Sequence, residues 1–338
     1  MTPLCSLQSL AEDSAATVHQ TIDRIYLEKG INALARAHHM SSMAGHLGAS
    51  LIAGFYIGVQ RQNLPSEVIQ GIEGDLQRVI HGESVFGKRM SKNSKLTDQE
   101  LFEPFSHQTP DESLIDGIAE SLAQSIDQPR QSGHNVIFGS LAIRALKDHP
   151  EYATPTVVDG IRRLMNRFVG QTPGSGYYGK KRGRIQGNKI TPNTSDETPD
   201  YNTIADMANA VLDEAINQDP SVHRIGYGGL VHIINHAAAI VDLADYGYDD
   251  LAQKAVLSHR KHLQLWRGLP NVASEKGQVP VSNHTPHSRE YWTSESVPYD
   301  RALLTHRVKT MFGFDELAAA VEASSKEKKA YESLRYLM

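Results

Sequence analysis

The stretch that most constrains the fold of this chain is a glycine turn followed by a long apolar run, HRIGYGGLVHIINHAAAIVDLADYG, at residues 223–247. The run contains no proline and is rich in alanine, leucine and branched aliphatic residues, which predicts a helix buried on most of its faces. His232 and His236 are four residues apart, so both imidazoles would lie on one face of that helix. Two buried imidazoles need partners, which a metal ion or the backbone carbonyls of a helical core could supply.

Helical periodicity continues through most of the 338 residues, whereas almost no run alternates with period two, so we expect few strands. The pattern predicts helices at about residues 7–29, 33–59 (with a break at Gly45 or Gly48), 65–80, 112–127, 133–148, 155–169, 203–217, 227–246, 249–266, 298–312, 314–323 and 325–336. Polar segments rich in glycine and proline predict long irregular loops at about residues 82–112, 170–202 and 267–297. The expected fold is a single all-α domain, residues 1–338, of packed helix pairs.

The composition excludes several classes of protein. A net charge of −5 argues against nucleic-acid binding. The single cysteine, Cys5, excludes an internal disulfide and a thiolate metal cluster, so a metal would need histidine, oxygen or a modified side chain, and the chain has 16 histidines. The first residues lack the pattern of a signal peptide, and the longest uncharged apolar stretch, about residues 47–59, is shorter than a bilayer span. We expect a soluble cytoplasmic protein with no membrane partner.

Common enzyme motifs are absent or lack their structural context. Residues 174–179, GSGYYG, match the dinucleotide-binding G-x-G-x-x-G, but a helix is predicted before them and a basic segment, KKRGR, follows. We expect a solvated loop there, whose cationic cluster could cover an anionic substrate. His81 and Glu83 have the H-x-E spacing of a facial-triad iron site without its strand, and no H-E-x-x-H, E-x-x-H or G-x-S-x-G occurs.

The sixteen histidines fall into different settings. His259 and His262 lie beside Arg260 and Lys261, which predicts a solvated helix face, and two further histidines at 284 and 287 lie in a predicted exposed loop. Four predicted helices, in contrast, carry a histidine inside an apolar run: His46 (with His39 two turns earlier), His134, His232 (with His236) and His306. Each alone is typical of a core histidine. Four together fit the way all-α folds build metal sites from facing helices.

Three segments carry a resemblance to a known family. GHNVIFGSLAIRAL, residues 133–146, is similar to H-G-x-I-R-x-A-H-A-V-R-A-L; GHLGASLIAGFYIG, residues 45–58, resembles a histidine-rich helix; and HRVK, residues 306–309, resembles H-x-x-K. The helix of His232 is similar to a central H-x-x-T/N-x-x-A element. These islands resemble the questin oxidase-like family, which includes fungal enzymes that cleave aromatic polyketides of the anthraquinone type.

The resemblance implies a non-heme iron dioxygenase, with iron held by histidines and a lysine carboxylated at its amine. Carried over by position, it implies as ligands His46, His134, His232, His306 and, as the carbamate, Lys309. Ser50 and Leu141 stand where the family has further histidines, and His236 and His39 are the second choices for a vacant position.

We therefore expect an oxygenase that uses Fe(II) and dioxygen on an aromatic or quinone-like small molecule, with ring cleavage as one outcome. One alternative is a metal-independent Baeyer–Villiger-type monooxygenase that uses NADPH, for which the GSGYYG segment would matter. The other is a non-catalytic helical protein that binds a small molecule. The sequence leaves the exact substrate, the regiochemistry, the metal identity and the oligomeric state open.

Overall fold

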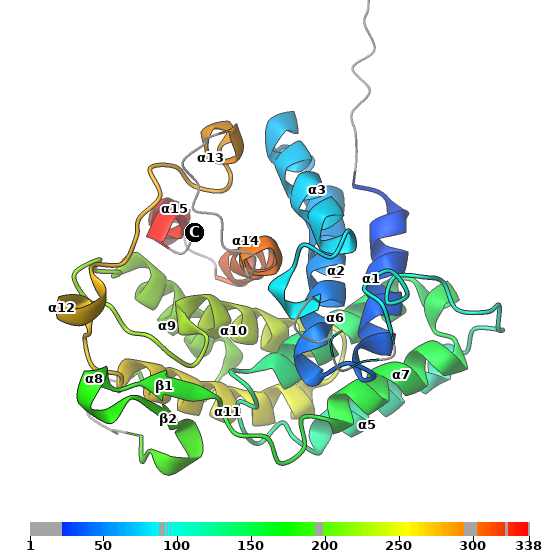
Figure 1. The fold of residues 1–338 in the computed structure, drawn as a ribbon, viewed down its shortest axis with the longest axis horizontal. Coiled ribbons are helices and arrows are strands. Elements are labelled where there is room, and N and C mark those ends of the chain that lie inside the picture. Colours follow the sequence, from blue (N-terminus) through cyan, green and yellow to red (C-terminus); the bar gives the residue numbers. More distant parts are fainter. Residues whose placement is uncertain are drawn as a thin grey trace, which may run out of the picture.

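The computed structural model describes residues 22–87, 92, 94, 96–192, 199–293, 303–321 and 324–336, and α-helices form most of its regular structure (Figure 1). The all-α prediction is confirmed. The helices are α1 (Arg24–Ala37), α2 (Gly45–Gln60), α3 (Ser66–Ile80), α5 (Asp116–Ala123), α6 (His134–Asp148), α7 (Pro155–Asn166), α8 (Gly179–Arg182), α9 (Ile204–Ile216), α10 (Gly229–Asp245), α11 (Asp249–Arg267), α12 (Ala273–Lys276), α13 (Arg289–Thr293), α14 (Leu303–Ala319) and α15 (Ser324–Ser333).

Two helices, α2 and α10, form the centre of the fold. They are apolar almost all round, and 13 residues of each are buried, as expected of helices surrounded by other helices. Helix α2 packs against α1, α3, α6 and α14, whereas α10 packs against α6, α9, α11 and α14. Helices α6 and α14 therefore contact both central helices, and the ends of all four can meet at one point.

Glycine allows the closest of these helix contacts. A Cβ atom at Gly48 of α2 would lie 2.4 Å from the carbonyl oxygen of Gly30 and 2.6 Å from the backbone nitrogen of Leu34, both in α1. Any side chain at this position would push the two helices apart. The small residues of α2 thus set its distance from α1.

The longest apolar stretch exceeds the length expected from the sequence. Ser42–Gln60 is helical over 19 residues and is long and apolar enough to cross a membrane by length and composition. However, 83% of its apolar window is buried inside the fold. This segment therefore has the position of a core helix.

Two predicted helix boundaries are wrong. The expected gap between 7–29 and 33–59 does not occur, because α1 runs without interruption from Arg24 to Ala37. The expected break at Gly45 is confirmed, because α2 begins there after a short 3₁₀ turn, Ser42–Ala44. The predicted break at residue 313 does not occur, since α14 continues through Gly313. A Cβ at Gly313 would lie 2.7 Å from Oδ1 of Asn235, so this glycine serves packing against α10. The predicted residues 7–21 and 298–302 lie outside the described part.

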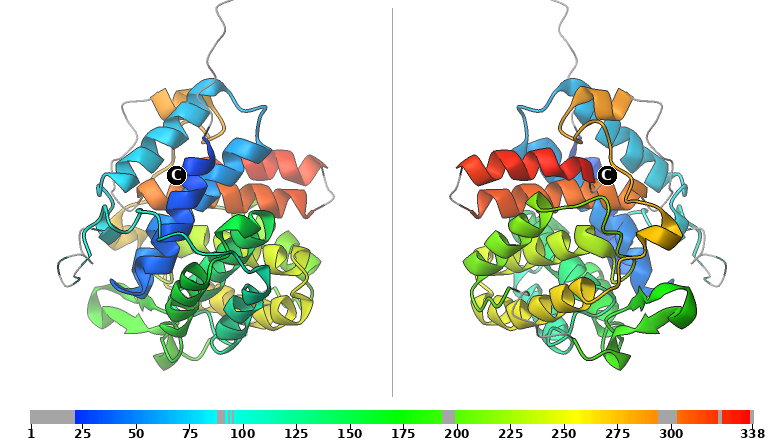
Figure 2. Two further views of the ribbon diagram at one scale, coloured as in Figure 1. Left: turned by 90° about the vertical axis from the view of Figure 1, so that its right-hand side faces the viewer. Right: turned by 90° about the vertical axis from the view of Figure 1, so that its left-hand side faces the viewer.

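Two of the three predicted irregular loops contain regular structure. Segment 170–202 holds an antiparallel hairpin of β1 (Ser175–Tyr177) and β2 (Arg184–Gln186), with α8 between the strands. The hairpin lies at the edge of the helical body (Figures 1 and 2). Segment 267–297 holds α12 and α13, whereas the described residues of 82–112 are mainly turns and bends. GSGYYG itself supplies β1, and the helix that begins at its last glycine, Gly179, has only four residues. The segment therefore lacks the strand–turn–helix context of a dinucleotide-binding motif.

Candidate metal centre

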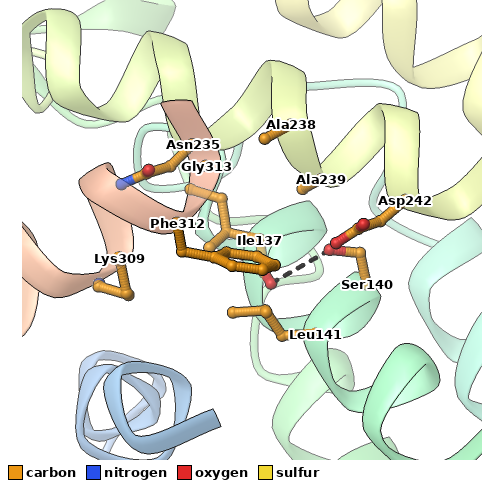
Figure 3. Close-up of a pocket in the computed structure, with 10 residues that line it drawn as sticks. All are labelled: Ile137, Ser140, Leu141, Asn235, Ala238, Ala239, Asp242, Lys309, Phe312 and Gly313. Carbon is orange, nitrogen blue, oxygen red and sulfur yellow. Dashed lines mark hydrogen bonds between the residues drawn. The ribbon is translucent and has the colours of Figure 1, made fainter. Parts of the chain in front are cut away.

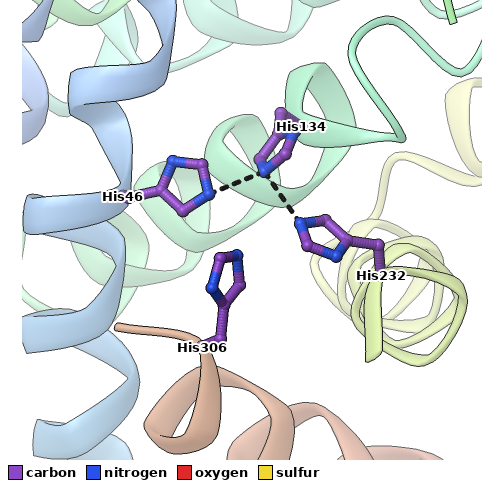
Figure 4. A group of neighbouring side chains, drawn as sticks. All are labelled: His46, His134, His232 and His306. Atoms are coloured by element: carbon purple, nitrogen blue, oxygen red, sulfur yellow. Dashed lines mark hydrogen bonds between the residues drawn. The ribbon is translucent and has the colours of Figure 1, made fainter. Parts of the chain in front are cut away.

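Four histidines converge from the first turns of four helices (Figure 4). They are His46 of α2, His134 of α6, His232 of α10 and His306 of α14. Helices α6 and α10 begin after glycines in the left-handed conformation, Gly133 (φ 84°) and Gly228 (φ 75°). Such residues let the chain turn sharply into a helix. The first turns of these two helices therefore face α2 and α14.

The reactive nitrogens of the four rings lie close together. Nε2 of His134 is 2.9 Å from Nε2 of His46 and 3.2 Å from Nε2 of His232. The ring of His306 has its centroid 5.1 Å from that of His46 and 4.8 Å from that of His232. One ligand atom from each of the four residues lies within 4.8 Å of all the others.

Backbone carbonyls determine the tautomers of three of these histidines. Nδ1 of His46 lies 2.7 Å from the carbonyl oxygen of Met43, and Nδ1 of His232 lies 2.6 Å from that of Gly228. Nδ1 of His134 makes the same contact with the carbonyl of Gln131. Because a carbonyl oxygen only accepts, each Nδ1 carries the proton and each Nε2 carries a lone pair.

The Nε2 contacts drawn as dashed lines in Figure 4 therefore bring lone pair against lone pair. Neither nitrogen of such a pair has a proton to donate, so the contact is repulsive without a cation. A metal ion bound by the three Nε2 atoms would convert this repulsion into coordination. A histidine that donates its other N–H to a carbonyl is the usual arrangement of a metal ligand.

Burial keeps the imidazoles of His46, His134 and His232 neutral. It lowers the pKa of His46 and of His134 well below the ordinary value, and it lowers the pKa of His232 to about 3. The nearby charge of Lys309 lowers all three further. Metal binding requires the neutral imidazole, and the buried site supplies it near neutral pH.

The two spacings that Nε2 of His134 makes with Nε2 of His46 and of His232 fit coordination of one transition-metal ion. Two nitrogens bound at ~2.1 Å lie ~3.0 Å apart at a right angle and ~3.4 Å apart at the tetrahedral angle. The two Nε2 distances of 2.9 Å and 3.2 Å match this range. The four histidines could therefore hold a metal ion, and no Asp, Glu or Cys of the described chain belongs to the group.

Lys309 lies beside this group. Its side chain is buried, and its Nζ lies 5.7 Å from the centroid of the Phe138 ring. Burial lowers the lysine pKa to about 7. The side chain thus lies inside the fold and not at the surface, and no carboxylate among the described residues forms an ion pair with it.

Two aromatic side chains lie at the site that the sequence analysis did not predict there. Phe86 stacks on His46 with centroids 3.8 Å apart and planes 7° from parallel, and Phe138 lies edge-on to His46 at 5.3 Å. Phe138 follows His134 by four residues, so helical spacing could have placed it at the site. Phe86 belongs to a segment without periodicity, and no local signal indicates its position.

The second-choice ligands lie elsewhere. His236 turns toward α11, where its Nδ1 is 3.2 Å from Nδ1 of His262. Nε2–H of His262 donates to the carbonyl of Tyr227 at 2.9 Å, so its Nδ1 accepts the proton of His236. His39 is exposed and packs on His38 with centroids 3.8 Å apart. Neither side chain belongs to the four-histidine group, because His236 is one turn farther along α10 and His39 precedes α2.

The predicted solvated face of α11 is wrong. His259 and His262 are both fully buried. Nε2–H of His259 donates to the carbonyl of Ile233 at 2.9 Å, and the Tyr201 hydroxyl donates to its Nδ1 at 2.6 Å. These two histidines therefore pack inward against α10 as core residues with backbone partners, although charged residues occupy the two positions between them.

Ser50 and Leu141 do not contribute to the four-histidine group. The Ser50 hydroxyl donates to the carbonyl of Leu47 at 2.9 Å. Leu141 lines a small cavity beside the site, between Lys309 and Asp242 (Figure 3). The volume of this cavity that the centre of a water molecule can occupy is about 10 Å³. The cavity therefore has room for about one water molecule.

A buried ion-pair network joins three of the four helices. Arg144 of α6 donates to Asp242 of α10 at 2.5 Å and to Glu316 of α14 at 2.9 Å. Burial raises the pKa of Asp242 to about 7, although the adjacent guanidinium lowers it. The network fixes the relative positions of the helices that carry His134, His232 and His306.

Comparison of the chain with protein-family models, with curated proteins and with solved structures found no match.

Proposed function

We propose that the protein is a mononuclear, non-heme iron oxygenase whose metal is held by His46, His134, His232 and His306. The observation that carries the proposal is the meeting of three Nε2 lone pairs at 2.9 Å and 3.2 Å, with every Nδ1 proton directed at a carbonyl. An arrangement of this kind is repulsive by itself and favourable around a cation. Bound iron would supply the binding and activation of dioxygen.

Lys309 is the proposed source of negative charge. Four neutral imidazoles leave the charge of a divalent ion uncompensated in a buried site. An ammonium ion at Lys309 would repel that metal, whereas burial favours the neutral amine. The neutral amine can add carbon dioxide, forming a nitrogen–carbon bond and releasing one proton. The carbamate so formed is an anionic oxygen ligand, as the resemblance to the questin oxidase-like family also implies.

An aromatic or quinone-like small molecule is the proposed substrate class. Phe86 and Phe138 supply flat apolar surfaces next to the histidines and exclude water from them. The cavity near Lys309 has room for about one water, so a ring would bind only after side chains rearrange. The roles of the residues are thus to hold the metal, to position a ring and to keep the site dry.

Elemental analysis of the purified protein tests the metal. Protein expressed with added iron and purified without chelator should contain close to one transition-metal ion per chain. His134→Ala should lose that metal, because Nε2 of His134 contacts both Nε2 of His46 and Nε2 of His232. His284→Ala, which changes an exposed loop histidine, is the matched control and should keep the metal.

Oxygen uptake by iron-loaded protein with hydroxylated anthraquinones then tests the reaction. Clean, folded protein without iron, manganese, zinc or copper would overturn the metal site. Oxygen uptake that requires NADPH and survives metal removal would instead support the metal-independent monooxygenase. Metal binding without any turnover would support a binding protein.

A further inference from the structure

A pocket of about 340 Å³ lies beside the hairpin, and the proposed metal centre does not use it. Its lining comes from three segments that are distant in sequence: the residues between β1 and β2, the segment after β2, and the C-terminal end of α11. These elements lie together at one edge of the molecule in Figure 1. The lining residues are Tyr178, Arg182, Lys189, Ile190, Thr191, Pro192, Gln264, Leu265 and Gly268.

The hairpin wall of the pocket is firmly attached to the helical body. The backbone N–H of Tyr177 donates to the carbonyl of Ile225 at 2.7 Å, and that of Tyr227 donates to the carbonyl of Ser175 at 3.1 Å. The hydroxyls of Tyr178 and Tyr227 lie 3.2 Å apart. The pocket is therefore formed before any ligand binds, and its volume lies within the usual range for small-molecule sites.

The charge of the lining is positive. Among the described residues that line the pocket, Arg182 and Lys189 are the only cations, and none is Asp or Glu. Neither cation forms an ion pair with a carboxylate of the described chain. The guanidinium of Arg182 lies 5.0 Å from the centroid of the Tyr178 ring, which keeps it at the pocket. Three more cations, Lys180, Lys181 and Arg184, occur in the same hairpin and add to the positive potential.

The rest of the lining is largely apolar. Ile190, Pro192 and Leu265 supply aliphatic surface, and Tyr178 supplies an aromatic ring. The apolar surface would not add to the affinity for an inorganic anion, and the charges of the two cations would not add to the affinity for a neutral apolar molecule. We propose that this pocket binds a small anionic molecule with a flat apolar body, such as an aromatic carboxylate or sulfonate, with Arg182 and Lys189 as partners of the anion.

A pair of fluorescent probes tests the proposal on metal-depleted, full-length protein, so that the result is independent of the metal centre. The anionic probe is 8-anilinonaphthalene-1-sulfonate, and the neutral probe is N-phenyl-1-naphthylamine, which lacks the sulfonate. One equivalent of the anionic probe should bind per chain. Binding should weaken when the salt concentration rises from about 0.05 M to about 0.5 M, because partly exposed ion pairs are screened.

The double variant Arg182→Gln/Lys189→Gln should bind the anionic probe about tenfold more weakly, with unchanged thermal unfolding. Lys180→Gln/Lys181→Gln removes the same number of charges from the hairpin, outside the pocket lining, and should leave the affinity within about twofold. Thr191→Trp adds an indole at an exposed lining position and should block both probes.

Three outcomes would overturn the proposal. The first is equal loss of affinity in the two double variants, which would show a general charge effect. The second is unchanged affinity in Arg182→Gln/Lys189→Gln. The third is equal affinity for the neutral and the anionic probe, which would show an apolar surface without an anion site.

Discussion

At the scale of single residues, the position of a histidine in the first helical turn determines which nitrogen it offers. His46 and His134 place Nδ1 against the carbonyl three residues earlier, and His232 places it against the carbonyl four residues earlier. This contact leaves Nε2 as the outward-facing acceptor in every case. The same local geometry on separate helices therefore delivers the same ligand atom to the centre.

The burial of Lys309 leads to a prediction about its substitution. Lys309→Ala should lose metal or turnover while keeping the helix, because alanine is an excellent helix former. Lys309→Arg should be equally damaging, because a guanidinium keeps its charge and cannot form the carbamate. Metal content, and incorporation of isotopically labelled bicarbonate at Lys309, are the measurements.

Full metal content and turnover in Lys309→Arg would show that Lys309 has no role in binding. Retained metal without label in the wild-type protein would remove the carbamate and leave the histidines in place.

Buried histidines also predict acid sensitivity. Burial lowers the pKa of His259 to about 3, whereas the unfolded chain has the ordinary value of about 6.5. Between these values the unfolded state binds the extra proton, so the free energy of unfolding falls as the pH falls from about 6.5 to about 3 and is unaffected above that window. One such proton corresponds to about 1.4 kcal/mol per pH unit.

The measurement is urea unfolding of metal-depleted protein at several pH values within this window. As the pH falls, the free energy of unfolding should decrease less steeply in His259→Gln than in the wild type. The difference in slope should be at most that of one proton, about 1.4 kcal/mol per pH unit. His284→Gln changes an exposed residue and should keep the wild-type slope. An unchanged slope in His259→Gln would contradict the neutral buried state of His259.

At the scale of elements, the glycine before α10 positions His232. Gly228 has φ 75°, and a Cβ there would lie 2.2 Å from Cγ of His232. Gly229 has φ 70°, but a Cβ there would meet nothing within 4 Å. Alanine at Gly229 would therefore cause backbone strain alone, whereas alanine at Gly228 would cause backbone strain and also displace the imidazole of His232.

Gly229→Ala should cost about 1–2 kcal/mol of stability, from the left-handed backbone alone, and should keep the metal. Gly228→Ala should cost at least as much and should also weaken metal binding by about 10–100-fold, because it moves His232 and the carbonyl that orients it. Metal titration and thermal unfolding of both variants test this. Equal metal affinities would show that Gly228 acts only through the backbone.

At the scale of the whole molecule, the Arg144 network connects the helices that form the site. Arg144→Met would leave Asp242 buried without its counter-charge and should reduce the free energy of unfolding by about 3–5 kcal/mol. Arg163→Met breaks an exposed pair with Asp159 on one helix and should cost less than about 0.5 kcal/mol. Urea unfolding at neutral pH compares the two.

The pH dependence of this loss follows from Asp242. Its pKa is raised by burial to about 7 in the fold, against about 3.9 in an unfolded chain, so rising pH across that range reduces stability. Without Arg144 the pKa rises further, and Arg144→Met should be more damaging at pH ~8 than at pH ~5. An equal loss of stability in Arg144→Met at the two pH values would show that Arg144 acts through packing alone.

Local patterns determined which segments are helical. Helix α3 was expected at 65–80 and occurs at Ser66–Ile80, and α6 was expected at 133–148 and occurs at His134–Asp148. Periodicity and helix-end residues act within a few residues of one another, so they can be read without the fold. The same patterns placed His46, His134, His232 and His306 inside apolar helices, and these are the histidines that the structure brings together.

Tertiary packing decided the rest. Nothing in the local sequence distinguishes the turn of α10 that faces α2 from the turn that faces α11, so His232 and His236 looked equivalent although they lie in different clusters. Three further features depend on which helices pack together: the stacking of Phe86 on His46, the burial of Lys309, and the side of α11 that faces the core. The reason is physical: a residue's periodicity gives its direction from its own helix, and only the neighbouring helices determine what lies in that direction.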